Sequence, residues 1–262
     1  MKGLPQILTV YASSPISVKL EVNGAAVKAF GVSTISEMNH QRWTAQQGDV
    51  SALTEFLGKQ AQPVEVFSLA LYEDESHEAV DIQPFSRPLK GRYCFFTQQG
   101  DLPEIHDRNL YAIGHHWPVG CSDQERAFCV LLERTLTLWH EGRPDHESRL
   151  ALISDYGARL DRLGAHNFSY WDGDYLFAYS SKREEESTPL CFYRLHEQSV
   201  SFGDGHRLTI NAEEGTEIVL VSNADLIDGL EANPIPPGTV ACFKSGKLLD
   251  RCEPVAFWTA DN

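Results

Sequence analysis

The chain has 262 residues, of which 37 are acidic and 22 are basic, so its formal net charge is -15. A chain of this length can bury a sizeable core, and we expect residues 1–262 to form a single domain. The negative charge repels nucleic acid and anionic membranes, so we expect neither as a partner.

The chain contains no run of about 18 apolar residues, and its first residues lack the apolar stretch of a signal peptide, so we expect a cytoplasmic protein. Its six cysteines are scattered without Cys-x-x-Cys pairs, which favours reduced thiols over a disulfide framework or zinc site. His115 and His116 are expected to be a surface pair whose rings point apart, and no third ligand has motif spacing. We therefore predict no metal and no cofactor.

The first half of the chain shows mostly strand patterns. The apolar run Ile7–Ala12 predicts a buried strand, and Ser13–Pro15 predicts a turn after it. Asn23-Gly24 is a hairpin signal, with Ala26–Val32 as the return strand. A short helix is predicted from Asp49 or Ser51 to Gly58.

Two further strands and two helices follow. Val64–Tyr72 and Arg92–Thr97 have strand patterns. Ser122 stands three residues before Glu125 in a capping box, which predicts a buried helix that ends near Gly142. A second helix is predicted from about Asp145 to Gly164.

The last third is again rich in strands. Asn167–Ser180 predicts a hairpin around Asp172-Gly173, and the charged run Lys182–Thr188 predicts a solvated loop. Three more strands are predicted at Leu190–Leu195, Glu217–Ser222 and Thr239–Lys244. The order of strands, two helices and strands indicates an α+β fold of two sheets packed face to face with helices outside.

Two segments carry a family resemblance. Arg92–Ile105 is an aromatic strand that breaks at Gly100, which places Gln98 and Gln99 at a strand end where a site would lie. Pro118–Cys129 has the pattern Pro-Val-Gly-x-Ser-Asp-x-Glu and leads into a helix. With the Trp171–Phe177 hairpin, these segments resemble the class II glutamine amidotransferases, specifically their single-domain relatives with an N-terminal-nucleophile fold. The resemblance implies a four-layer αββα sandwich of two antiparallel sheets.

The same resemblance implies that most catalytic positions are replaced. Pro5 lies where the family has its nucleophilic cysteine, and Ala70 lies where an arginine holds the glutamine carboxylate. Gln83 replaces the histidine of Thr-His-Pro-Phe. Gln99 replaces the oxyanion asparagine, so Gly100 alone remains of the oxyanion pair. The family's Asp-Gly-Trp-Gly-Ile segment has no counterpart.

The resemblance places Asp123 where the family binds the substrate ammonium. It thereby makes six residues candidates for a vestigial ligand pocket: Gln98, Gln99, Gly100, Cys121, Ser122 and Asp123. Each also has a plainer interpretation. Asp123 is a favourable acid in the first turn of a helix, the two glutamines are polar strand-end residues, and Cys121 is a loop cysteine before a helix N-terminus.

Glutamine hydrolysis in this fold needs a thiol whose own terminal amine acts as the base, and Pro5 provides no thiol. We therefore predict no catalytic residues and a binding or regulatory subunit. Its partner would be a paralogous amidotransferase, a synthase-type enzyme, or an amino-acid or γ-glutamyl ligand.

Two alternatives remain open. One is an active amidotransferase or γ-glutamyl amide hydrolase that uses Cys121, or Pro5 exposed by processing, as an atypical catalytic group. The other is a structural subunit whose cleft is filled by its own side chains, aromatic ones in particular.

Overall fold

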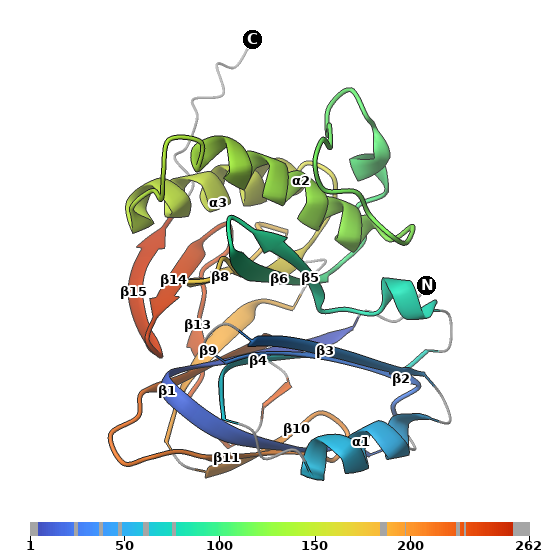
Figure 1. Cartoon of the computed structure of the whole chain (residues 1–262), viewed down its shortest axis with the longest axis vertical. Helices are drawn as coiled ribbons and strands as arrows, with labels where there is room; N and C mark the ends of the chain where they lie inside the picture. The colour runs from blue at the N-terminus through green and yellow to red at the C-terminus, as the bar shows by residue number, and fades with distance from the viewer. Residues whose placement is uncertain are drawn as a thin grey trace.

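The computed structural model describes residues 5–23, 26–36, 39–46, 49–59, 63–74, 77–183, 188–196, 198–223, 226–227 and 229–253. These residues form two antiparallel sheets that lie face to face, with helices on the outside (Figure 1). The predicted α+β sandwich of two antiparallel sheets is therefore confirmed.

The larger sheet has nine strands within the described residues, and β1 lies at its centre. The path runs β13-β9-β12-β1-β4-β2-β3, and β11 pairs with the second half of β1 and with β10. The strands are β1 (Gln6–Glu21), β2 (Ala29–Ser36), β3 (Asn39–Gln46), β4 (Val64–Tyr72), β9 (Leu190–Leu195), β10 (Gln198–Phe202), β11 (His206–Asn211), β12 (Ile218–Asn223) and β13 (Asn233–Pro234).

The smaller sheet has six strands within the described residues, in the order β15-β14-β8-β7-β6-β5. They are β5 (Phe85–Leu89), β6 (Arg92–Gln99), β7 (Asn167–Trp171), β8 (Leu176–Tyr179), β14 (Val240–Lys244) and β15 (Lys247–Cys252). Its strands alternate between two apolar layers, as the two-residue period of a strand requires. In β6, Phe95 packs between the sheets and Phe96 packs towards the helices.

The outer layers differ between the two sheets. Helices α2 (Asp123–Leu138) and α3 (His146–Leu160) cover the six-stranded sheet. The nine-stranded sheet is covered by the single helix α1 (Val50–Lys59) and by β10 and β11, which fold back under it (Figure 1). Two 3-10 turns, η2 (Ala79–Asp81) and η3 (Pro103–His106), flank β5 and β6. None of the described helices combines the length and the apolar character needed to span a bilayer.

The turn predicted at Ser13–Pro15 is wrong, because β1 continues through it to Glu21. The register with β4 shifts between Tyr11 and Ile16, where β1 leaves β12 and joins β11. Ser13 stabilises this irregular stretch, since its backbone N–H donates to the Glu217 carbonyl at 2.9 Å and its hydroxyl accepts from Glu217 N at 3.0 Å. The serines that indicated a turn therefore support a bulge.

The hairpin predicted at Asn23-Gly24 does not pair its two strands. β2 begins at Ala29 and pairs with β4 and β3, not with β1, and Gly24 lies outside the described residues. The predicted two-residue turn at Asp172-Gly173 is four residues long. The Asp172 carboxylate accepts from Asp174 N and Tyr175 N, both at 2.9 Å, and this shapes the longer turn.

Other elements match their predictions closely. β4 and β9 have the predicted bounds, α3 is capped by Asp145, and α2 ends at Leu138 rather than near Gly142. Most of the predicted solvated loop, residues 184–187, lies outside the described residues.

Candidate functional site

Two of the positions that we predict to be replaced catalytic ones lie near each other at one end of the space between the sheets. Pro5 is buried directly before β1. In the sheet register, Ile7 of β1 pairs with Ala70 of β4, and Ala70 pairs with Gly31 of β2. Ile7 and Ala70 are both buried in the apolar cluster between the sheets. The positions predicted for the nucleophile and the arginine are therefore close together, and both are apolar.

Gln83 joins this end of the molecule from the segment before β5. Its carbonyl oxygen lies so close to Gly31 that a Cβ there would be 2.0 Å away. The side-chain Oε1 accepts from Gln98 N at 2.5 Å, and Nε2 donates to the Gln98 carbonyl at 2.9 Å. Gln83 N donates to the Tyr72 hydroxyl at 3.0 Å, and burial raises the pKa of that hydroxyl. The Gln83 side chain thus bonds to the backbone of Gln98 in β6 as a neighbouring strand would.

Gln99 connects the two sheets. Its Oε1 accepts from Asn223 Nδ2 at 2.6 Å and from Asn167 Nδ2 at 3.4 Å. Asn167 begins β7 in the same sheet, whereas Asn223 ends β12 in the other sheet. The neighbouring Ser222 pairs with Leu8 of β1, so this contact lies at the same end as Pro5. We call Gln99, Asn167 and Asn223 the amide bridge.

Gly100 has two structural requirements that do not involve an oxyanion. Its φ is 102°, which an L-residue with a side chain rarely adopts. A Cβ at this position would lie 2.1 Å from the carbonyl oxygen of Ala165. The Gly100 carbonyl accepts from Gln98 Nε2 at 3.2 Å and from Gln124 Nε2 at 2.9 Å. The glycine is thus explained by backbone packing alone.

The loop before α2 holds a carboxylate from within the chain. Asp81 Oδ1 accepts from the backbone N–H groups of Cys121, at 3.0 Å, and Ser122, at 3.1 Å. A Cβ on Gly120 would lie 2.0 Å from the same oxygen. N–H groups before a helix form an anion-binding position, and here Asp81 occupies it. The Cys121 side chain is exposed.

Asp123 and Ser122 have clear structural contacts. Ser122 is the N-cap of α2, as predicted, because its hydroxyl accepts from Glu125 N at 3.2 Å. Asp123 Oδ2 accepts from Leu102 N at 2.8 Å, and Oδ1 lies 2.9 Å from His106 Nε2. Asp123 therefore attaches the start of α2 to the loop after β6. Its role towards an ammonium group stays a prediction.

The structure brings most of the predicted residues together. Gln98 bonds to Gln83 and to the Gly100 carbonyl, and Gln124 also donates to that carbonyl, which connects the end of β6 to the loop that carries Cys121, Ser122 and Asp123. The groups that meet at the strand ends are amides, a phenol and backbone N–H groups. Such groups can form hydrogen bonds to a ligand or to each other, but none is a nucleophile or a base at neutral pH.

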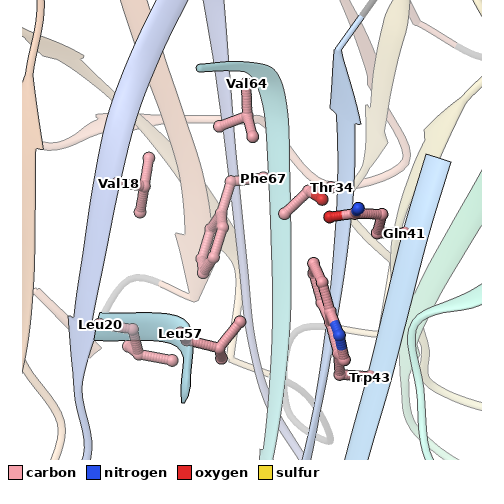
Figure 2. A pocket seen from close by; sticks show the side chains of 8 residues that line it. All are labelled: Val18, Leu20, Thr34, Gln41, Trp43, Leu57, Val64 and Phe67. Carbon is pink, nitrogen blue, oxygen red and sulfur yellow. The ribbon is translucent and has the colours of Figure 1, made fainter. Parts of the chain in front are cut away.

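An apolar crevice on the other side of the nine-stranded sheet is too small to be a substrate site. The residues labelled in Figure 2 come from β1, β2, β3, β4 and α1, and the volume of the crevice is about 30 Å³, which holds about two water molecules. Its lining residues are Val18, Leu20, Thr34, Gln41, Trp43, Leu57, Val64 and Phe67. We assign it no ligand.

A comparison with known families decides which fold family this geometry represents. The family model described as class II glutamine amidotransferases matches residues 72–260 of this sequence, which is more than half of the chain. The chain belongs to the class II glutamine amidotransferases. The matched region of this amidotransferase-family protein includes Gln83, Gln98 and Asp123.

Individual relatives agree with this assignment. An uncharacterized protein of Methanocaldococcus jannaschii is 32% identical over 184 residues, 66% of this chain and 48% of the relative. A protein of Escherichia coli named as a putative glutamine amidotransferase is 26% identical over 170 residues, 63% of this chain and 64% of the relative. The aligned part thus spans between about half and two thirds of these relatives.

A solved structure supports the amidotransferase fold. The crystal structure of a predicted glutamine amidotransferase from Pseudomonas aeruginosa PA01 superposes with a TM-score of 0.75. The superposition covers 94% of this chain and 99% of that chain, at 17% sequence identity. At this level of identity the likeness establishes the shared fold.

Sequence reasoning missed several residues of this amidotransferase-like site. Asn223, Asn167 and Asp81 were not singled out, although all three contact predicted positions. Asn223 is a polar residue at the end of a buried strand, the same signal that identified Gln99. Only the packing of the sheets shows that these two strand ends face each other. His115 and His116 do not point apart, since both contact Glu133.

Proposed function

We propose that this class II family member does not hydrolyse glutamine and serves as a binding or regulatory subunit. The observation that carries the proposal is Pro5, buried at the head of β1 where the resemblance puts the nucleophile. A proline ring has no thiol that could attack an amide carbonyl. Loss of the nucleophile alone suffices to abolish this reaction, whatever the other groups contribute.

The other replaced positions support the same proposal. The Ala70 side chain has no group for pairing with a carboxylate, and it is buried among apolar residues. Gln99 is longer than the asparagine it replaces, and its Oε1 is already bonded within the amide bridge. An oxyanion donor must lie about 2.7–3.1 Å from the oxygen on which the charge develops, and the longer side chain of Gln99 carries its amide nitrogen further from the backbone than an asparagine would.

The assay is ammonia release from glutamine by the purified full chain, with heat-inactivated protein as the control. We expect no release above the control. Ammonia production by the wild type would overturn the proposal, and two further measurements would then locate the catalytic group. Loss of activity in Cys121→Ser would assign it to Cys121, and an intact mass that begins at Pro5 would assign it to a terminal proline.

We further propose that the partner is a protein, either a paralogous amidotransferase or a synthase-type enzyme. The segment between η3 and α2 supports this, because three of its large apolar side chains are strongly exposed: Leu110 at 72%, Trp117 at 63% and Val119 at 73%. Exposed apolar side chains gathered on one segment are typical of interaction surfaces. The polar groups at the strand ends near Pro5, in contrast, form hydrogen bonds to each other.

Affinity purification of the tagged full chain from its native host tests the partner. We expect a class II glutaminase or a synthase to co-purify with the wild type and to be lost with Trp117→Ala. Leu249→Ala is the matched control, because Leu249 is also exposed, at 45%, but lies on β15. Retention by Trp117→Ala, or loss with both variants alike, would contradict the proposed surface.

The ligand alternative has its own readout. A glutamine-induced rise in melting temperature that Asp123→Asn abolishes would support an amino-acid ligand at the old pocket. We expect no shift that depends on Asp123, since both of its oxygens already have partners in the chain.

A further inference from the structure

A second opening lies at the opposite end of the space between the sheets. Along β1, Gln6 lies at the Pro5 end and Tyr11 lies five residues further on. In the other sheet, β6 begins at Arg92 and ends at Gln99. Tyr11 and Arg92 line a cavity of about 310 Å³, at the lower end of the range for small-molecule sites. Seven residues along β6 separate Arg92 from Gln99 of the amide bridge, about 23 Å, and four residues along β7 separate Trp171 of the cavity from Asn167, about 13 Å.

Arg92 offers this cavity a fixed positive charge. Its Nη1 donates to the Gly173 carbonyl and to Asp174 Oδ1, both at 2.7 Å. A Cβ on Gly173 would lie 2.8 Å from Arg92 Cδ, so the arginine stem packs directly on the turn. Within the described residues, Nε and Nη2 of Arg92 have no bonding partner, and the side chain is 39% exposed. Two donors therefore remain available in a held guanidinium group.

Asp174 does not neutralise Arg92 fully, because it is shared. Its Oδ2 also pairs with Arg149 Nη1 at 3.0 Å and with Arg143. Asp172 adds one further carboxylate, at 2.8 Å from Arg149. This turn thus holds three arginines against two aspartates, and Arg92 is the one among the three that lines the cavity. An anionic group on a ligand would complete the charge balance.

Glu65 provides a separate negative charge in the same cavity. It lies on β4, in the sheet opposite Arg92, and has no hydrogen bond or ion pair within the described part of the chain. Burial raises the pKa of the Tyr11 hydroxyl, and the Glu65 carboxylate adds to this effect, which places the two groups near each other. A free carboxylate beside aromatic rings is a favourable position for an ammonium group.

Aromatic side chains form the walls between the two charges. Tyr93 stacks on His40, with ring centroids 4.7 Å apart, and Trp171 packs edge-on against Tyr11 at 4.9 Å. Trp171 Nε1 is buried and has no hydrogen-bond partner among the described residues. The walls thus combine aromatic rings with an unpartnered indole N–H, while the charges of opposite sign stand on different sheets.

We propose that this cavity binds a small zwitterion of the amino-acid or dipeptide class, with its carboxylate on Arg92 and its ammonium group on Glu65. The guanidinium donors suit a planar carboxylate, which they can bind in a bidentate manner. The proposal is independent of the old amidotransferase pocket, because none of the residues that line the cavity belongs to the amide bridge.

Isothermal titration calorimetry of the full chain tests the proposal with a ladder of zwitterions. Glycine, β-alanine, 4-aminobutyrate and 6-aminohexanoate place the two charges at increasing separation. Hexanoate and hexylamine are the matched ligands that carry only one charge each. We expect one or two neighbouring members of the ladder to bind, and both single-charge ligands to bind at least about tenfold more weakly, since each lacks one charge-assisted contact.

Variants then test the assigned residues. Glu65→Gln and Arg92→Met are each expected to weaken binding by about 10- to 100-fold. Arg134→Met, which removes an exposed arginine on α2, should leave binding unchanged. If circular dichroism shows that Arg92→Met does not fold, the binding measurement with Glu65→Gln alone decides the test. Equal binding of hexanoate or hexylamine, binding unaffected by Glu65→Gln, or no binding by the whole ladder would each overturn the proposal.

Discussion

Gln83 shows how a residue at a position predicted to be a replaced catalytic one can stabilise the fold. It is 2% exposed and satisfies both the N–H and the carbonyl of Gln98. β5 begins at Phe85, opposite Phe96, so it does not reach these groups of Gln98, and a buried backbone group without a partner is costly. At this position a histidine ring could not offer a donor and an acceptor in the same geometry as an amide.

Replacing Gln83 should therefore destabilise the protein. We expect Gln83→Ala to lower the free energy of unfolding by about 2–4 kcal/mol, because two buried backbone groups lose their partners. Urea denaturation followed by circular dichroism measures this. Gln124→Ala is the control, since that partly exposed side chain donates only to Gly100 and Asp101, and it should cost less than about 1 kcal/mol. Equal effects of the two substitutions would contradict the assigned role.

Asp172 allows a prediction with a pH dependence. Its carboxylate is fully buried, and burial raises its pKa above the ordinary value, although Arg149 opposes this shift. A raised pKa in the folded state means that protonated Asp172 is better tolerated in the fold than the charged form. The stability that protonation provides is present at acidic pH and is lost as the pH rises through the pKa of the folded state.

Arg149→Met should leave Asp172 charged and unpaired at neutral pH, at a cost of about 3–5 kcal/mol in unfolding free energy. Without the arginine, the Asp172 pKa rises further, so the cost should shrink as the pH is lowered from 7 towards 5. Urea denaturation at several pH values checks both points. The exposed Arg134–Asp155 pair is the comparison, because Arg134→Met should cost at most about 1 kcal/mol. A penalty that is independent of pH would contradict this explanation.

At the level of elements, α3 lies exceptionally close to the six-stranded sheet at Gly157. A Cβ on this residue would be 2.4 Å from the Tyr179 ring of β8. The Tyr179 hydroxyl also donates to the Asp161 carboxylate just after α3, so the ring has little freedom to move aside. A glycine in mid-helix, which propensity alone disfavours, is thus explained by helix–sheet packing.

Gly157→Ala should accordingly destabilise the protein by about 1–3 kcal/mol through overpacking, although alanine is the better helix former. Thermal and urea unfolding measure the effect. The reference is Ala151→Gly on the exposed face of the same helix, where propensity alone predicts a loss of about 1 kcal/mol. Stabilisation by Gly157→Ala would show that the packing at Tyr179 is looser than described.

How well an element could be predicted depended on where it lies in the sheets. β4 and β9 lie inside the larger sheet and are almost wholly buried, so their apolar residues were recognised with exact bounds. β3 and β15 are edge strands that alternate between partly buried and exposed positions, and their polar sequences gave no clear strand pattern. For the site, strand-end logic found Gln98 and Gln99. It could not find Asp81, because that contact depends on a loop 40 residues before Cys121.

At the level of the whole molecule, burial separates the six cysteines into classes. Cys94, Cys129, Cys191 and Cys242 are buried, Cys252 is partly buried and Cys121 is exposed. Burial raises the pKa values of Cys129 and Cys242 to about 12, so these thiols stay protonated at neutral pH.

A thiol reagent such as dithionitrobenzoate should therefore titrate the native protein in steps. We expect one fast equivalent from Cys121, a slower one from Cys252, and the remaining four only after unfolding. Absorbance at the thionitrobenzoate band follows the reaction, and Cys121→Ser should remove only the fast phase. More than two reactive thiols in the native state would contradict the described packing.

The amide bridge has a consequence for any attempt to engineer a catalytic cysteine into this chain. Asn223 and Gln99 join the two sheets at the end of the molecule where Pro5 lies. We therefore expect that a terminal cysteine installed in place of Pro5 would act on a substrate only after this contact between the sheets has also been removed.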